Sequence, residues 1–297
     1  MAKSDPEKNS KPTAYKEVST PRLSERDFKV FQRYIEHDIG IKMPPAKRVM
    51  LESRLIKRIR VLGLASFSEY LDIVFSSDSS QTELIHMIDA VTTNKTDFFR
   101  ENEHFRYLTH VLLPDRLGAE GWGREGMLKV WSCASSSGEE VYSLAMTLEE
   151  FSRAHPPYKY RILGSDISTR MLERCRSAVY PVDRIQPVPE AMRKKYLLRS
   201  KDRTAQLVKI RPELRERTLF HRVNLMEDDY GIRDSFNIIF CRNVIIYFDR
   251  QRQIELMKKL HAHLIPGGYL FLGHSETLAG MDVPFRSVAP TVYRGEL

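Results

Sequence analysis

One stretch, residues 127–166, constrains the fold more than any other part of the chain. It reads as a short apolar strand, a loop of small residues (SCASSSG, 132–138), a helix from Glu139 to Phe151 and a second strand that ends on Asp166. This order is typical of the first unit of a nucleotide-binding α/β sheet, in which the ligand lies beyond the carboxyl ends of the strands. We therefore expect the loop and Asp166 to lie beside a ligand.

The second half of the chain continues this alternation. The apolar patterns predict helices at 139–153, 168–178 and 250–264, strands at 128–134, 160–166, 236–242 and 269–273, and a closing antiparallel hairpin within 285–293. Alternation of this kind implies right-handed βαβ units and a parallel sheet covered on both faces. The segment at about 181–222 breaks the pattern. It predicts a helix (189–198) and extended pieces (207–210, 218–223), so we expect a small β-rich insertion there.

The N-terminal third has a different organisation. Residues 1–21 hold few apolar side chains and are expected to form a mobile tail. Residues 22–91 predict a helical domain, in which Ser24 is a suitable N-cap for the first helix and Gly63 a suitable C-cap for the second. Two further helical patterns run over 66–74 and 80–91.

Positive charge is concentrated in two places. The net charge is +8, and Lys and Arg outnumber Asp and Glu by seven to one in residues 42–63 and by twelve to four in 184–222. Lys47, Arg54 and Arg58 share one face of the predicted second helix. That face is either the solvated side of a core helix or a docking surface for an acidic partner. Nucleic acid, an anionic membrane and an acidic protein surface are all candidates for that partner.

Other classes of protein are disfavoured. The longest apolar runs are too short to cross a membrane, and the polar start lacks the apolar core of a signal peptide, so we expect a cytoplasmic protein without membrane insertion. Three cysteines without C-x-x-C spacing fit a reducing compartment. No P-loop or G-x-S-x-G motif is present, and His261 and His263 point away from each other on a helix, so no metal site is expected.

The linker at 92–105 (TTNKTDFFRENEHF) is unusually rich in polar and aromatic residues. Asn94, Thr96 and Arg100 are interleaved with three phenylalanines. The segment is either the start of a helix whose phenylalanines pack into the core, or a lid whose polar groups face a ligand. Composition alone leaves both interpretations open.

A second polar group follows the buried strand within FNIIFCRNVIIYFD (236–249). Packing alone does not explain why such a strand ends on Arg242 and Asn243, and the strand tip is where the ligand of an α/β sheet lies. Asn224 closes the preceding short strand, and Tyr247 is near enough to lean over the same crevice. With Asp166, whose carboxylate is suited to both hydroxyls of a ribose, these residues predict a nucleoside site.

Taken together, the motifs resemble those of the chemotaxis receptor methyltransferase (CheR) family. They are TTNKTDFFRENEHF, VWSCASSSGEEVYSLAM, GSDIS, NLMEDDYGIRDSFNIIFCRNVIIYFD and GHSETL, and they occur in order between about residues 24 and 294. The resemblance implies an all-helical N-terminal domain and, over 106–297, an α/β class I (Rossmann-like) methyltransferase sheet with a small inserted β-subdomain. It also implies an enzyme that transfers the methyl group of S-adenosylmethionine to glutamate side chains on the cytoplasmic helices of chemoreceptors. The products would be γ-glutamyl methyl esters and S-adenosylhomocysteine.

The resemblance also implies site residues. Arg100 and Tyr247 would orient the carboxylate or the methyl donor, and the Lys47/Arg54/Arg58 face would dock acidic receptor helices. The family's cofactor-binding positions match Asn94, Thr96, Arg100, Glu140, Asp166, Asn224, Leu225, Arg242 and Asn243. Within this set, Asp166 would hold the ribose and Glu140 a positive part of the cofactor. A glutamate substrate is already an anion at neutral pH, which agrees with the lack of a catalytic dyad.

Some positions depart from the family pattern, and two other functions remain open. The loop SKDRTAQ (200–206) lacks the glycine with which some members grip a receptor tail, while Val141 and Asn237 replace a usual proline and aspartate. The alternatives are an RNA methyltransferase, although aromatic residues for base stacking are sparse in the insertion, and a non-catalytic cofactor-binding regulator of receptors. For the main hypothesis we expect a monomer that binds no nucleic acid.

Overall fold

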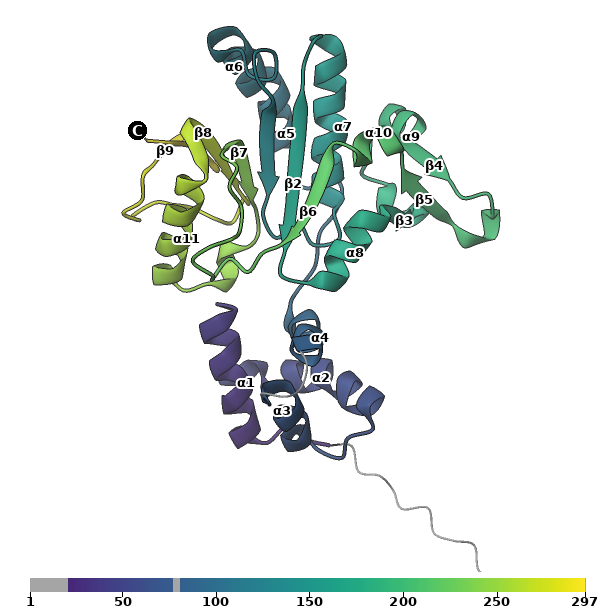
Figure 1. The fold of residues 1–297 in the computed structure, drawn as a ribbon, viewed down its shortest axis with the longest axis vertical. Coiled ribbons are helices and arrows are strands. Elements are labelled where there is room, and N and C mark those ends of the chain that lie inside the picture. The colour runs from purple at the N-terminus through teal and green to yellow at the C-terminus, as the bar shows by residue number, and fades with distance from the viewer. Residues whose placement is uncertain (1–20, 77–80, 297) are drawn as a thin grey trace, which may run out of the picture.

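The computed structural model of the protein describes residues 21–76 and 81–296. A helical part and a sheet-containing part are joined by the linker at 92–105, as Figure 1 shows. The mobile tail expected at 1–21 lies almost wholly outside the described residues. In the described ranges, none of the helices is long and apolar enough to span a bilayer.

The N-terminal part is all-helical, as predicted. Its elements are α1 (Glu25–Asp38), η1 (Pro45–Lys47), α2 (Arg48–Leu62), α3 (Phe67–Phe75) and α4 (Gln81–Val91). The Ser24 hydroxyl caps α1 by accepting the Asp27 N–H at 3.0 Å. Gly63 ends α2 in the left-handed conformation, with φ 68°. The inward faces of α1 and α2 form a separate core that includes Phe31, Ile35, Leu51 and Leu55.

A seven-stranded sheet forms the second part, in the order β6-β2-β1-β7-β8-β10-β9. Parallel pairing joins β6 (Thr218–Arg222), β2 (Tyr160–Asp166), β1 (Leu128–Ser132), β7 (Phe236–Cys241) and β8 (Leu264–Leu272). The predicted closing hairpin, β9 (Phe285–Ala289) and β10 (Val292–Gly295), is antiparallel. The parallel α/β sheet expected from the alternating pattern is therefore confirmed, with the antiparallel hairpin along one edge.

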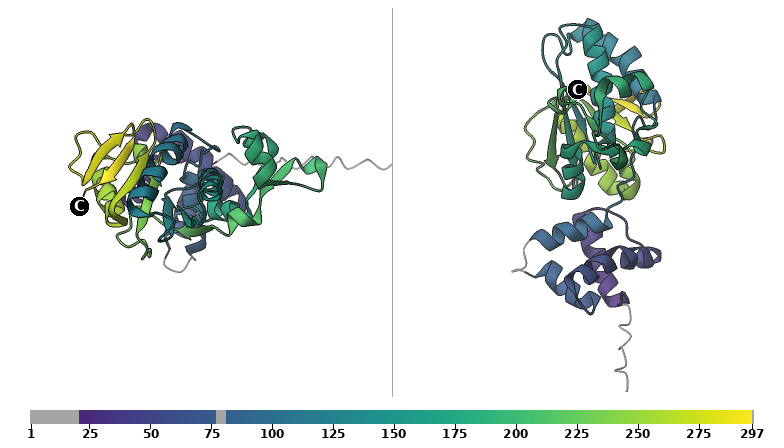
Figure 2. Two further views of the ribbon diagram at one scale, coloured as in Figure 1. Left: turned by 90° about the horizontal axis from the view of Figure 1, so that it is seen from above. Right: turned by 90° about the vertical axis from the view of Figure 1, so that its right-hand side faces the viewer.

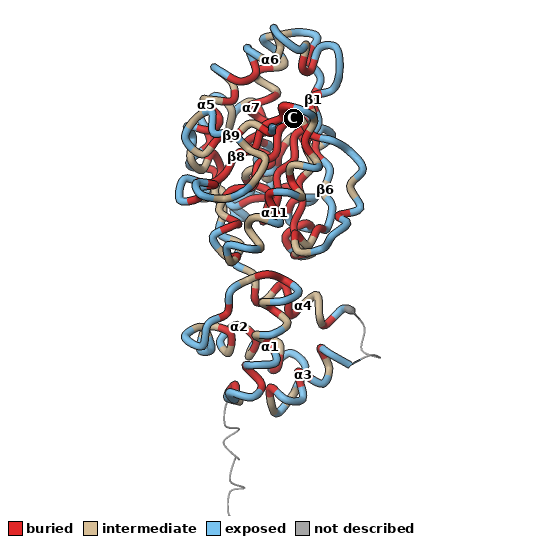
Figure 3. The backbone as a smooth tube through the Cα atoms, turned by 90° about the vertical axis from the view of Figure 1, so that its left-hand side faces the viewer, coloured by how far each residue is buried: buried red, intermediate tan, exposed pale blue. Residues whose placement is uncertain are grey.

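Helices cover both faces of this sheet. Neighbouring residues of a strand point to opposite sides, so each central strand packs against helices on both faces. Phe240 of β7 packs on one face with side chains of α5 (Glu103–Tyr107) and α7 (Glu139–Ala154). Ile239 packs on the other face with α11 (Arg250–Ala262). Figure 3 shows the buried residues concentrated along the strands and the inward sides of the helices. The remaining helical elements here are η2, a π-helical turn (Leu108–Leu112), α6 (Leu113–Glu120), α8 (Thr169–Ser177) and η5 (Ile245–Tyr247).

The inserted subdomain projects from the main sheet (Figures 1 and 2). Its antiparallel strands have the order β3-β5-β4. They are β3 (Val179–Pro181), β5 (Leu207–Ile210) and β4 (Leu197–Arg199), and the short helices are η3 (Val182–Ile185), α9 (Glu190–Tyr196), η4 (Arg203–Ala205) and α10 (Pro212–Arg215). The subdomain ends before the expected residue 222, because β6 pairs with β2 in the main sheet. The helix predicted to reach residue 198 ends at Tyr196, because the chain then pairs with β5.

Candidate active site

A cavity of about 410 Å³ lies between the carboxyl ends of the parallel strands and the helical domain. Its volume is in the range typical of small-molecule sites, roughly 300–1,000 Å³. Every residue that the sequence placed at the ligand site lines it: Asn94, Thr96, Arg100, Glu140, Asp166, Asn224, Leu225, Arg242, Asn243 and Tyr247. The fold thus brings the linker, the tips of β2 and β7 and the start of α7 together at one sheet edge.

The helical domain supplies an apolar part of the lining that the sequence analysis missed. Ile39, Ile41, Met43 and Met50 line the cavity. Apolar side chains in an amphipathic helical region look like core residues, so no sequence signal separates them. Several hydrogen bonds hold this domain over the sheet. The Asn224 side-chain amide donates to the Asp38 carbonyl at 2.7 Å, a backbone bond joins the Lys42 N–H to the Tyr247 carbonyl at 3.0 Å, and Arg170 of α8 donates to the Asp89 carbonyl of α4 at 3.1 Å.

Asp166 is buried at the tip of β2 and is held by backbone groups. Its Oδ2 accepts the Ser136 N–H, and its Oδ1 accepts the Ser168 N–H, both at 2.8 Å. Burial raises the pKa of the Asp166 carboxyl to about 6, although these N–H groups act in the opposite direction. The Ile167 N–H acts on the same carboxylate, so its orientation is fixed by backbone donors, which are fewer than its roughly four acceptor positions.

The loop after β1 reaches Asp166 through left-handed backbone. Ala134 and Ser136 have φ 49° and Gly138 has φ 94°. A Cβ atom on Gly138 would lie 2.9 Å from the Tyr180 hydroxyl and 3.0 Å from the Cys175 sulfur. The glycine is therefore required by both its conformation and its surroundings. The small side chains before it allow the backbone to line the cavity.

Arg242 joins three segments at the tip of β7. Its Nη1 lies 3.1 Å from Oε2 of Glu140, and its Nη2 lies 3.0 Å from Oε2 of Glu101 and donates to the Arg100 carbonyl. Its Nε has no partner among the described residues. Burial raises the pKa of Glu140, and Arg242 opposes that shift. Arg242 is therefore the cation paired with Glu140 in the protein without cofactor.

Glu101 is one of two acidic residues that the sequence-based site lacked. Besides Arg242, it accepts the Asn243 side-chain amide at 3.2 Å and the His274 backbone N–H at 3.2 Å. Burial opposes its ionisation, but Arg242 and these donors outweigh burial, so the pKa of Glu101 is lowered. Glu101 follows Arg100 directly in the linker motif, and this position was a signal that could have identified it.

Glu276 is the second acidic residue that the sequence-based site lacked. Its carboxylate accepts the backbone N–H groups of Asn243 and Val244 at 2.8 Å, Ile245 at 2.9 Å and Gly273 at 2.6 Å. Burial raises the pKa of Glu276, and the backbone donors counteract the shift. The GHSETL motif places this acid just after β8, which runs parallel to β7 and so ends at the same edge of the sheet, and this position was the available sequence signal.

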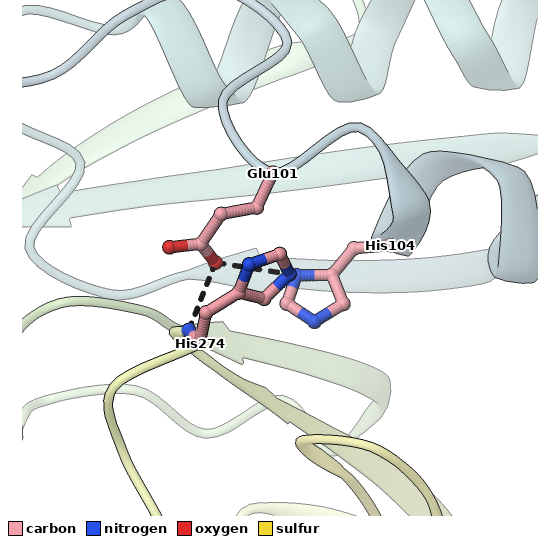
Figure 4. Close-up of side chains that lie close together, drawn as sticks. All are labelled: Glu101, His104 and His274. Carbon is pink, nitrogen blue, oxygen red and sulfur yellow. Dashed lines mark hydrogen bonds and ion pairs between the residues drawn. The ribbon is translucent and has the colours of Figure 1, made fainter.

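Glu101 also belongs to a cluster with His104 and His274 (Figure 4), whose possible metal-ligand atoms lie within 4.8 Å of one another. The His104 Nδ1 is 3.7 Å from the Glu101 carboxylate, and its Nε2 is 2.7 Å from the Thr291 hydroxyl. Burial and the charge of Arg242 lower the pKa of His104 to about 4, so its ring is neutral at neutral pH. Because Arg242 already occupies the position of a cation beside Glu101, we interpret the cluster as part of the Arg242 anchor.

The two interpretations of the linker both describe part of it. Phe98, Phe99 and Phe105 are buried in the core of the sheet domain, and the Phe99 N–H donates to the Ser143 hydroxyl at 2.9 Å. The polar residues at 92–97 and Arg100 line the cavity. Arg100 is more than one third exposed and is held mainly by a 3.3 Å hydrogen bond to the Lys95 carbonyl. The helix begins only at Glu103.

The basic face predicted on α2 differs from a free docking surface. Arg58 forms a bidentate pair with Glu83, at 2.9 and 2.6 Å, and Arg54 donates to the Val91 and Thr92 carbonyls. Lys47 lines the cavity and donates to the Lys42 carbonyl at 2.8 Å. All three side chains are only partly exposed, because helix packing brings them to acceptors within their own domain.

Comparison with known proteins covers nearly the same span as the described structure. Residues 26–92 match the model of the "CheR methyltransferase, all-alpha domain", and residues 94–294 match the "CheR methyltransferase, SAM binding domain". "Chemotaxis protein methyltransferase 2" of Pseudomonas aeruginosa is 38% identical over 90% of this chain and 92% of its own length. The "Chemotaxis protein methyltransferase" of Salmonella typhimurium is 36% identical over 91% of this chain and 90% of its own. That of Borreliella burgdorferi is 34% identical, over 88% and 91%.

Proposed function

The chain belongs to the CheR methyltransferase family, and on that premise we propose that it methylates glutamate side chains on the cytoplasmic helices of chemoreceptors. The methyl donor is S-adenosylmethionine, and the products are γ-glutamyl methyl esters and S-adenosylhomocysteine. The observation that carries the proposal is that every ligand residue implied by the family motifs lines one cavity. The protein would act as a monomer in the cytoplasm.

The residues present fit this methyl donor. The Asp166 carboxylate lines the cavity and is an acceptor suited to ribose hydroxyls, and the cavity combines this acid with apolar and aromatic walls. When bound, S-adenosylmethionine supplies an electrophilic methyl group. We assign Asp166 to the ribose, and the remaining cofactor contacts to Asn94, Thr96, Arg100, Glu140, Asn224, Leu225, Arg242 and Asn243.

The chain's part in the reaction is to position its substrates. A glutamate with a pKa near 4.3 is ionised at neutral pH, so no residue has to remove a proton. Arg100 and Tyr247 line the same cavity, and we assign them to orienting the incoming carboxylate. Orientation and exclusion of water can contribute about 7–11 kcal/mol to lowering such a barrier.

Receptor docking is proposed at the mouth of the cavity, next to Lys47. Lys47 is the member of the predicted basic face that lines the cavity. Arg54 and Arg58 support this surface indirectly, since their hydrogen bonds join α2 to the start of the linker and to α4. Neither the RNA nor the non-catalytic alternative is favoured by an observation of comparable weight.

A transfer assay tests the proposed function. Receptor-containing membranes from the same organism are incubated with the protein and S-adenosylmethionine carrying a tritiated methyl group. We expect label on the receptor that alkali releases as methanol, because methyl esters hydrolyse in base. Label that survives alkali, or label found only on added structured RNA, would contradict the proposal.

A further inference from the structure

Glu276 has no place in the cavity lining, yet it contacts the backbone that forms one wall. It lies in the loop after β8 and is 4% exposed. Its carboxylate collects the N–H groups of three consecutive residues, Asn243 to Ile245, together with that of Gly273. A single carboxylate thereby saturates its lone pairs with backbone donors from two separate strand tips.

These donors belong to the turn that carries much of the cavity wall. The chain leaves β7 at Cys241 and turns at Asn243, a non-glycine residue with φ 59°. Asn243, Val244, Ile246 and Tyr247 all line the cavity. The turn enters η5 without a side-chain cap of its own. The Glu276 carboxylate therefore takes the place of a local cap and offsets the cost of the left-handed residue.

Gly273 lets the two loops approach closely. A Cβ atom there would lie 2.4 Å from Nδ2 and 2.9 Å from the backbone N of Asn243. The Asn243 amide in turn reaches Glu101 at 3.2 Å. The position of Asn243 is thus determined by Glu276 at its backbone and by Glu101 at its side chain.

We propose that Glu276 is a positioning residue of the active site: its carboxylate sets the path of the 243–247 turn and thereby the cofactor affinity and the orientation of Tyr247. The inference rests on the proposed function for its effect on methyl transfer. An amide cannot replace the carboxylate, because the NH2 group of glutamine would face backbone N–H donors and leave some of them unpaired.

The test compares Glu276→Gln with Glu276→Asp and with Glu255→Gln, a matched control on the exposed side of α11. Calorimetry with S-adenosylmethionine is run below the unfolding temperature of each variant, and transfer to receptor membranes is measured alongside. We expect Glu276→Gln to weaken cofactor binding about tenfold or more, equivalent to losing one or two charge-assisted bonds. The KM for S-adenosylmethionine should rise with it, and Glu276→Asp should recover part of the loss.

Wild-type behaviour separates the two proposals. If wild-type protein binds the cofactor but yields no alkali-labile label, the proposed function fails and the binding comparison still tests Glu276. If folded Glu276→Gln binds and transfers like Glu255→Gln, the positioning role is overturned. Should Glu276→Gln not fold, Glu276→Asp decides: an affinity and kcat equal to wild type would overturn the inference, and a weakened affinity would support it.

Discussion

The guanidinium of Arg242 lies 3.0 Å from the carboxylate of Glu101, and this pair joins the linker to the tip of β7. The side chain of Arg242 is 2% exposed and that of Glu101 is 12% exposed. Arg242 completes the bridge with a second pair to Glu140 at 3.1 Å. One buried cation, Arg242, therefore holds the linker, the end of β7 and the start of α7 in fixed positions relative to one another.

Replacing Glu101 by Gln should weaken this bridge. Arg242 loses a charge-assisted partner, so we expect the free energy of unfolding to fall by about 1.5–3 kcal/mol at pH 7. Urea unfolding measures the change, and Glu103→Gln, at a neighbouring exposed side chain, is the control. The pKa of Glu101 is lowered in the folded state, so its contribution is present at neutral pH and disappears as the pH falls below its usual range. A difference from wild type that persists unchanged at pH 3 would contradict this.

Cofactor affinity should depend on the ionisation of Asp166. Burial raises its pKa to about 6, and ribose hydroxyls donate to the ionised form, so binding should strengthen as the pH rises through 6. At pH 5 we expect S-adenosylmethionine to bind about tenfold more weakly than at pH 7. Calorimetry across this range measures the effect, and Asp166→Asn should bind weakly with a much flatter profile. An identical pH profile in both proteins would exclude Asp166 as the titrating group.

The same shift has the opposite effect on the unliganded protein. Because the folded-state pKa of Asp166 is above its unfolded value of about 3.8, the folded state favours the protonated acid. The contribution of Asp166 to stability is then complete below pH 4 and is lost as the pH rises through 6. Urea unfolding of wild type and Asp166→Asn at pH 4 and pH 7 measures this contribution. The free energy of unfolding of wild type, relative to that of the variant, should be lower at pH 7 than at pH 4.

Arg58 should behave as a stabilising residue of the helical domain. Its removal in Arg58→Ala leaves the nearly buried Glu83 without its bidentate partner, although Tyr70 still donates to it at 2.9 Å. We expect a loss of about 3 kcal/mol in unfolding free energy. Lys57→Ala, at the adjacent exposed position, should change it by less than about 0.5 kcal/mol. Unchanged stability of Arg58→Ala with lost receptor binding would instead favour a docking role.

Tyr247→Phe and Arg100→Ala test the orienting roles. Tyr247 contributes its carbonyl, not its hydroxyl, to the bond with Lys42, and Arg100 is partly exposed, so both variants should fold normally. A misplaced nucleophile typically costs about a hundredfold in rate. We expect kcat to fall by that order in the transfer assay, with circular dichroism and thermal unfolding unchanged. Near-normal kcat in both variants would remove them from the reacting centre.

Much of the architecture could be predicted because the relevant signals are local. Alternating strand and helix periods indicate a parallel sheet, and the carboxyl ends of parallel strands necessarily meet at one edge. Asp166, Arg242 and Asn243 could therefore be grouped without coordinates. The boundaries of the insertion could not, because β6 has the same pattern whether it pairs with β2 or with a separate small sheet.

The sequence by itself determined the sheet, the helical domain and the strand-tip residues that line the cavity. Only the tertiary structure decided which of the charged side chains are already paired. Arg58 and Glu83 are separated by 25 residues, and Glu276 and Asn243 by 33. Periodicity reports which face of an element a residue occupies, whereas the partner on that face depends on how distant elements pack. Arg54 and Arg58 of the predicted basic face thus bond to acceptors of the helical domain and the linker, and the Glu276 carboxylate holds the backbone of the cavity wall.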